Sequence, residues 1–149
     1  MKFLYSLVFS SMMLASSICN GQVDTGDKQP LSMLYEFYTS YSGLGFGVEY
    51  KHKADSLHQI YCTPQLTKQA KELLQYDHEL LTDDWGITNE SLASLKITKD
   101  HTKENTYVVS YILDTYPVSP AIPVRKRIYY LVTVIREGET YKIASVNEE

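Results

Sequence analysis

Hydrophobic and polar residues follow two different periods along this chain, a helical one in the first half and an alternating one in the second. Between residues 30 and 41 the apolar positions recur at intervals of three and four, as on one face of a helix. They are Leu34, Phe37, Tyr38 and Tyr41. Pro30 stands at the first helical position, where proline is favoured because the helix needs no amide hydrogen there. The sequence therefore predicts a first helix over residues 30–41.

Two further helices follow the glycine-rich residues 42–47, whose alternating glycines disfavour a helix. Residues 54–61 fit a second short helix. Its predicted inward residues are Leu57, Ile60 and Tyr61. Thr63 followed by Pro64 matches the N-cap and first position of a third helix, which extends to about Gln75. Its apolar face comprises Leu66, Ala70, Leu73 and Leu74.

After Gly86 the pattern changes to the alternation that is typical of strands. Four strands are predicted, over residues 95–98, 106–113, 126–136 and 141–146. Residues 137–139 predict a tight hairpin turn, whereas residues 114–124 contain three prolines and predict a long, stiff connection. Helices followed by four antiparallel strands indicate the α+β class, with the helices packed on one face of a curved four-stranded sheet.

The two central strands are apolar on both faces. In residues 106–113 one face carries Tyr107, Val109, Tyr111 and Leu113, and the other carries Val108, Ser110 and Ile112. A sheet with one covered face alternates more cleanly than this. We therefore expect the second face to be covered too, by the proline-rich connection or by another subunit.

The N-terminus predicts export, to the periplasm or the outside of the cell. Lys2 precedes an apolar run over residues 3–15, and small polar residues follow to Gly21, which together resemble a cleaved signal peptide over residues 1–22. That run is too short to span a bilayer. A lipid anchor at Cys19 is not expected, because the bulky Ile18 before it fits such sites poorly. Residues 23–29 then form a flexible leader, and residues 30–149 a single domain.

Charge and cysteine content narrow the classes of function. Fourteen Lys and Arg against eighteen Asp and Glu give a net charge of −4, which argues against nucleic acid as a partner. The basic run Arg125–Lys126–Arg127 is interpreted as an edge guard or a solubilising strand end rather than as an anion site. With Cys19 in the signal peptide, Cys62 is alone, and we favour a small buried apolar residue over a reactive thiol.

The side chains that could perform chemistry do not form a known motif. The densest metal-capable set is Asp77, His78, Glu79, Asp83 and Asp84. It lacks the glycine and terminal glutamate of a calcium loop and the cysteines and histidines of a zinc site, so helix capping is favoured and no metal or cofactor is expected. The histidines, His52, His58, His78 and His101, lie in polar segments and are expected to be exposed. No nucleophile elbow accompanies them, so a hydrolase triad has no support.

The chain has thirteen tyrosines, many of them on elements that should face one another. A tyrosine ring with its polar tip suits a pocket for an amphipathic or sugar-like ligand, and it suits an ordinary core equally well. The sequence leaves both alternatives open.

Three short motifs resemble a family of exported bacterial proteins known as domain of unknown function 3828. They are the aromatic helix over residues 34–41, the segment Tyr61–Leu66, and Asp77 followed by Asp84–Trp85. Asp83 stands where the family has glutamine. The resemblance covers about residues 31–146. It implies a fold like nuclear transport factor 2 or cystatin, in which helices close over a curved sheet to form a cone-shaped pocket, and it implies no activity.

These features predict a non-enzymatic exported binding domain. Its pocket would be bounded by the first helix, the segment around Asp84 and the concave sheet. The candidate ligand-binding residues are Tyr38, Tyr41, Tyr61, Asp84, Trp85 and Tyr111. One alternative is an enzyme that uses Asp84 with a tyrosine as acid and base. Another is a protein-partner module, immunity-like or part of a surface complex, or a homodimer formed through the sheet.

Overall fold

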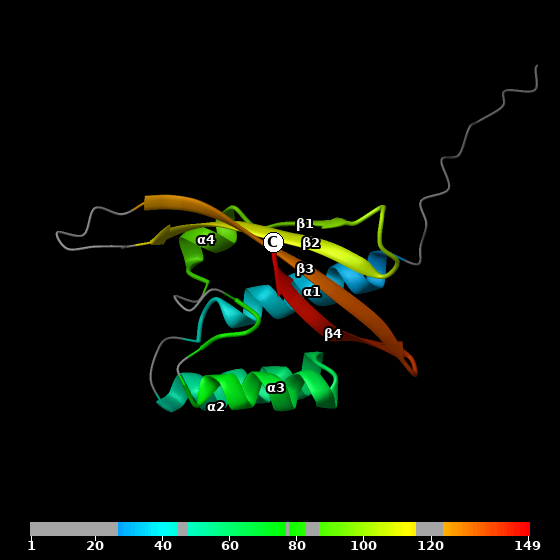
Figure 1. Cartoon of the computed structure of the whole chain (residues 1–149), viewed down its shortest axis with the longest axis horizontal. Coiled ribbons are helices and arrows are strands. Elements are labelled where there is room, and N and C mark those ends of the chain that lie inside the picture. The colour runs from blue at the N-terminus through cyan, green and yellow to red at the C-terminus, as the bar shows by residue number, and fades with distance from the viewer. Residues whose placement is uncertain (1–26, 45–47, 77, 83–86, 116–123) are drawn as a thin grey trace, which may run out of the picture.

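The structure is a computed structural model that describes residues 27–44, 48–76, 78–82, 87–115 and 124–149. Its elements are α1 (Lys28–Tyr41), α2 (Val48–Tyr61), α3 (Pro64–Leu74), α4 (Asn89–Ala93), β1 (Lys96–Lys99), β2 (Thr106–Thr115), β3 (Val124–Glu137) and β4 (Thr140–Glu148). The strands form one antiparallel sheet in the order β1-β2-β3-β4 (Figure 1), which confirms the predicted α+β class. Within these ranges no helix has the length and apolar character needed to cross a bilayer.

Helix α1 begins earlier than predicted, at Lys28, so that Pro30 is the third residue of the helix rather than the first. Proline is still tolerated there, because the first-turn amides lack intrahelical acceptors. Asp27, directly before the helix, accepts two hydrogen bonds from Lys99 Nζ at 2.7 and 2.8 Å and one from the Tyr107 hydroxyl at 3.3 Å. Residues 27–29, predicted to belong to a flexible leader, are therefore part of helix α1 and its contacts with the sheet.

Helix α2 is longer than predicted and turns a different face inward. It starts at Val48, and its buried residues are Ala54 and His58, one helical turn apart. Ile60, predicted to point inward, is 59% exposed, because it is displaced by two positions from His58 and lies on the opposite side of the helix. The prediction that His58 is exposed is likewise wrong.

Helix α3 begins as predicted, since Thr63 is its N-cap and accepts a hydrogen bond from the Leu66 amide at 3.3 Å. The same residue attaches the helices to the sheet. Its amide donates to the Ile143 carbonyl of β4 at 2.9 Å, beside a parallel bridge between Cys62 and Ile143. Cys62 is a buried free cysteine, as favoured from the sequence, and burial raises the pKa of its thiol to about 12.

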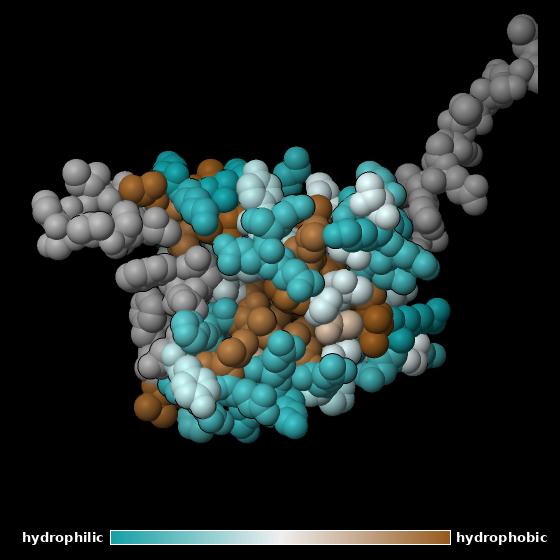
Figure 2. Space-filling view, viewed as in Figure 1, coloured by the Kyte–Doolittle hydropathy of each residue, from teal (hydrophilic) through white to brown (hydrophobic). Residues whose placement is uncertain are grey.

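The core lies between the inner face of the sheet and helices α1, α2 and α3. The buried inner residues of β2 and β3 are Tyr107, Val109, Tyr111, Leu113, Ile128, Tyr130, Val132 and Val134. A register shift between Thr133 and Val134 lets Ile143 and Val146 of β4 both join them. In the space-filling view apolar side chains gather between the sheet and the α2–α3 pair, with polar ones around them (Figure 2).

The outer face of the sheet carries apolar side chains that are partly open to solvent. Tyr129 is 42% exposed and Ile135 is 41% exposed. Residues 116–123 of the proline-rich connection, one of the two expected covers, lie outside the described residues, so a cover over this face stays a prediction. The basic run lies at a locally open edge, because β4 pairs with β3 only from Tyr130 onward and residues 125–127 pair with β2 alone. This agrees with the prediction that the run guards an edge of β3. Arg125 and Lys126 lie exposed at its start, which fits the solubilising alternative.

The hairpin between β3 and β4 is the one predicted over residues 137–139. Gly138 has a φ of +62°, in the left-handed region that favours glycine. The turn before β2 contains Asn105 at a φ of +53°, a conformation that asparagine tolerates better than most residues.

Candidate functional site

The predicted ligand-binding tyrosines lie inside the protein. Tyr38, Tyr41 and Tyr111 are buried in the core, and Tyr61 is half-buried at the end of α2. The Tyr38 hydroxyl donates to the Leu81 carbonyl at 3.2 Å. These rings line none of the three cavities described below. Their positions agree with the core alternative. Asp84 and Trp85 lie outside the described residues, as do Asp77 and Asp83.

Four polar side chains meet beneath α1 and α2, a set that we call the Glu79 cluster: Tyr41, Tyr50, His58 and Glu79. Glu79 Oε2 accepts hydrogen bonds from the Tyr41 hydroxyl at 2.9 Å and from the Tyr50 hydroxyl at 2.5 Å. The Tyr41 oxygen also lies 2.8 Å from His58 Nε2, and the two rings stack with centroids 5.7 Å apart. The cluster thus joins α1 and α2 to the segment after α3.

The hydrogen positions in the cluster follow from the count of donors. Tyr41 has one hydroxyl hydrogen and donates it to Glu79, so His58 must donate its Nε2 hydrogen to the Tyr41 oxygen. His58 Nδ1 then carries a lone pair, and it has no hydrogen-bond partner in the described structure. Burial lowers the pKa of His58 to about 4, so the ring is neutral at pH 7.

Through its hydrogen bonds, Glu79 fixes the segment of residues 78–82 to helices α1 and α2. Its Oε1 accepts from the Leu81 amide at 3.2 Å, while Oε2 takes the two phenol hydrogens. Burial raises the pKa of Glu79, and these hydrogen bonds oppose the rise. Because the carboxylate accepts these three donors, it holds the segment in place. The hydrogen bonds of Glu79 hold Leu81, which is fully buried, in place.

A cavity of about 210 Å³ opens beside Glu79. Its other lining residues are Leu73, Leu80, Thr82, Tyr130, Val146 and Glu148. A second cavity, of about 250 Å³, lies between α2 and α3. Its wall includes Lys71, whose Nζ lies 3.6 Å from Asp55 Oδ2. Among the residues that the structure describes, no group of three or more His, Cys, Asp or Glu side chains has an arrangement that could hold a metal ion.

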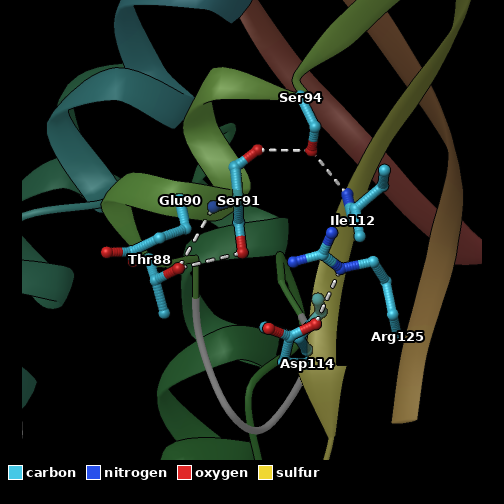
Figure 3. A pocket seen from close by; sticks show the side chains of 8 residues that line it. Thr88, Glu90, Ser91, Ser94, Ile112, Asp114 and Arg125 are labelled. Atoms are coloured by element: carbon cyan, nitrogen blue, oxygen red, sulfur yellow. Dashed lines mark hydrogen bonds and ion pairs between the residues drawn. The ribbon is translucent and has the colours of Figure 1, made fainter. Parts of the chain in front are cut away.

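A larger cavity, about 360 Å³, lies where α4 meets β2 and β3, and we call it the α4 cavity (Figure 3). Its lining residues are Thr88, Glu90, Ser91, Ser94, Ile112, Leu113, Asp114 and Arg125. Helix α4, which the sequence analysis did not predict, has Thr88 as its N-cap. The Thr88 hydroxyl oxygen accepts from the Ser91 amide and lies 3.1 Å from the Ser91 hydroxyl oxygen.

Helix α4 is fixed to the sheet through Ser94. The Ser94 hydroxyl donates to the Ser91 carbonyl and accepts from the Ile112 amide, both at 2.7 Å. Strand β1 pairs with β2 only as far as Lys96 opposite Ser110. The next outward amide of β2, that of Ile112, is therefore satisfied by a side chain instead of a strand. This substitution leaves room for the cavity at the start of β1.

The opposite wall of the α4 cavity is an ion pair across two strands. Asp114 and Arg125 are register partners on β2 and β3, and Arg125 Nε donates to Asp114 Oδ1 at 3.1 Å. Arg125 is 73% exposed, so the pair adds little stability. It does place charged groups opposite the hydroxyls of α4, on the same face of β2 as the apolar side chain of Ile112.

Sequence reasoning missed both polar regions for identifiable reasons. The signal for His58 was the spacing of Ala54, His58 and Tyr61 on one helical face, which the choice of Ile60 as an inward residue obscured. The signal for α4 was Thr88 followed by Glu90, a capping residue before an acidic first turn. The five-residue helix is too short for a hydrophobic period to reveal it.

Comparisons with known proteins support the fold class alone. A solved structure of a protein of unknown function from Bacteroides thetaiotaomicron is similar, with a TM-score of 0.66 and 18% sequence identity, over 83% of this chain and 94% of that chain. At that identity the likeness concerns the fold. No protein-family model matches the chain, and no curated protein does.

Proposed function

We propose that this protein is an exported, non-enzymatic binding domain that holds a small hydroxyl-rich ligand, such as a sugar, in the α4 cavity. The observation that carries the proposal is the size and lining of this cavity. At about 360 Å³ it falls within the range of roughly 300–1,000 Å³ that is typical of ligand pockets, whereas the cavities of about 250 and 210 Å³ fall below it.

The lining of the α4 cavity favours hydroxyl groups on the ligand. Thr88 and Ser91 offer hydroxyls on one side, and the Asp114–Arg125 pair offers acceptors and donors on the other. A sugar hydroxyl both donates and accepts, so it can bond to each of these groups, while the carbon face of the ring can rest on Ile112. A wholly apolar ligand would leave these polar groups unpaired.

Trp85 provides the test, because the only tryptophan of the chain stands three residues before Thr88 in the sequence. Its fluorescence is titrated with neutral and acidic sugars, short peptides and lipid micelles. We expect a saturable change with sugars, and at least about tenfold weaker binding in Ile112→Phe, which adds bulk to the floor of the cavity. Gln75→Phe, a matched change in the α2–α3 cavity, should bind as the parent does. Absence of a response to every sugar would refute the proposal.

Family and location belong to the same proposal. The three sequence motifs support membership of the family known as domain of unknown function 3828, and the N-terminal pattern supports export with cleavage after Gly21. The test is to express the full chain in a bacterium, fractionate the cells and measure the molecular mass of the recovered protein by mass spectrometry. We expect the protein recovered from the periplasm or the medium to have the mass of a chain that starts at Gln22. Full-length protein in the cytoplasm would contradict export.

A second candidate function, association through the sheet, rests on its outer face. Tyr129 and Ile135 are each more than 40% exposed there, and the half-buried Leu131 lies between them on β3. Such a surface fits a protein partner or a second copy of the chain. Light scattering of the mature protein tests the dimer: a dimer that Tyr129→Lys converts to a monomer is expected, and a parent that stays monomeric at high concentration would contradict it.

A further inference from the structure

The hydrogen-bonding capacity left in the α4 cavity lies on two facing walls. Among the described residues, Arg125 makes one hydrogen bond, from Nε to Asp114, and this leaves both terminal nitrogens of its guanidinium for a ligand. Figure 3 shows the guanidinium turned toward the hydroxyl of Ser91 across the cavity, and Glu90 extending away from the Asp114–Arg125 pair. The guanidinium of Arg125 therefore faces the Ser91 hydroxyl rather than a second carboxylate.

The wall formed by α4 has one hydroxyl hydrogen to spare. Thr88 and Ser91 have two hydroxyl hydrogens between them, and the contact of 3.1 Å between their oxygens uses one. The Ser94 hydroxyl hydrogen is used on the Ser91 carbonyl. The remaining hydrogen of the Thr88–Ser91 pair can therefore donate into the cavity, opposite the fork of Arg125.

We propose that the ligand of the α4 cavity carries a carboxylate, bound on one side by the two terminal nitrogens of Arg125 and on the other by the Thr88–Ser91 hydroxyl pair. This inference rests on the proposed function and narrows it from sugars to sugar acids. A planar guanidinium matches a planar carboxylate through two parallel hydrogen bonds. Asp114, bonded to Nε, is a positioning residue that keeps the fork directed across the cavity.

The test compares hexoses with their own uronic acids, so that each pair differs mainly in the carboxylate. Glucose, galactose and mannose are titrated against glucuronate, galacturonate and mannuronate by calorimetry, with galactose 6-phosphate as a further probe. In the parent we expect the preferred uronic acid to bind at least about tenfold more tightly than its neutral hexose. Arg125→Gln should reduce this ratio to about one, because the carboxylate of the uronic acid then has no cationic partner among the described residues that line the cavity.

Two more variants distinguish the effect of the planar guanidinium of Arg125 from the effect of positive charge in general. Arg125→Lys keeps the charge and loses the planar fork, so an intermediate ratio is expected. Lys71→Gln removes the exposed cation of another ion pair, that with Asp55, and should leave the ratio unchanged. A ratio of one in the parent, a preference that survives Arg125→Gln, or tighter binding of galactose 6-phosphate would overturn the carboxylate assignment alone. If no hexose binds in either form, the proposed function fails, and this inference fails with it.

Discussion

The Glu79 cluster and the α4 cavity contain similar polar groups and use them in opposite ways. In the cluster, Glu79 accepts two phenol hydrogens and a backbone amide, and three separate segments are joined by these bonds. In the cavity, the hydroxyl pair and Arg125 each retain donors that no described group accepts. Buried polar groups that hydrogen-bond to one another stabilise a fold, whereas groups with unused donors that face a cavity can select a ligand.

This difference changes the meaning of the many tyrosines. Tyr38, Tyr41 and Tyr111 are buried, and the hydroxyls of the first two are bonded within the protein. Their rings supply apolar burial and their hydroxyls bind the segment after α3 to the helices. These three tyrosines therefore belong to the core of this small domain.

The largest expected effect is the loss of a core ring. Tyr111→Ala removes a fully buried side chain between α1 and the sheet and should lower the free energy of unfolding by about 3–5 kcal/mol. Urea denaturation measures this. Tyr76→Ala, at a site that is 75% exposed, should cost under about 1 kcal/mol. Equal costs for the two variants would mean that Tyr111 is not part of the core.

The next effect is a dependence of stability on pH that comes from His58. Its pKa falls from 6.5 to about 4 on folding, so between these values the unfolded chain binds a proton that the folded chain does not. Stability is therefore lost as the pH falls from 6.5 through 4, by roughly 3 kcal/mol in total. The raised pKa of Glu79 acts in the opposite direction.

Because Glu79 offsets part of this effect, variants are needed to isolate it. His58→Gln should remove the loss of stability on acidification, whereas His52→Gln, at an exposed site on the same helix, should retain it. Urea midpoints measured from pH 7 to pH 4 give the comparison. An identical pH profile for His58→Gln and the parent would show that the histidine is not buried in its neutral form.

A smaller loss of stability is expected from removing a hydrogen bond of the Glu79 cluster. Tyr41→Phe leaves Glu79 short of one donor and His58 Nε2 without its acceptor, which should cost about 1–3 kcal/mol. Tyr76→Phe, which removes an exposed hydroxyl, should change the free energy of unfolding by less than about 0.5 kcal/mol. A Tyr41→Phe variant as stable as the parent would contradict the structural role of the cluster.

The smallest effect on stability is expected in the α4 cavity. Arg125→Gln removes an exposed ion pair and should change the free energy of unfolding by less than about 1 kcal/mol, since solvent screens the pair. Thermal unfolding monitored by circular dichroism measures this change. A large loss of stability would mean that Arg125 stabilises the fold, as the Glu79 cluster does. The contrast between the two regions would then no longer hold.

The sequence predicted the fold better than the site. Periodicity placed α1, α3 and all four strands, and Thr63, Pro64 and Gly138 were assigned to their caps and turn for the correct physical reasons. The Glu79 cluster was not predicted, because it is assembled from residues up to 38 positions apart whose contact depends on how α1, α2 and the segment after α3 pack. Local spacing cannot encode that packing. The α4 cavity similarly depends on where β1 begins, which a four-residue strand marks only weakly.

The central claim is that a ligand binds beside α4 and not among the buried tyrosines. Backbone amide chemical shifts, recorded by NMR during titration with the tightest-binding uronic acid, test it most directly. We expect saturable shifts at Thr88, Ser91, Ile112 and Arg125, with Tyr38, Tyr41 and Tyr111 unchanged. Shifts centred on those three tyrosines, with the α4 residues unaffected, would contradict the claim.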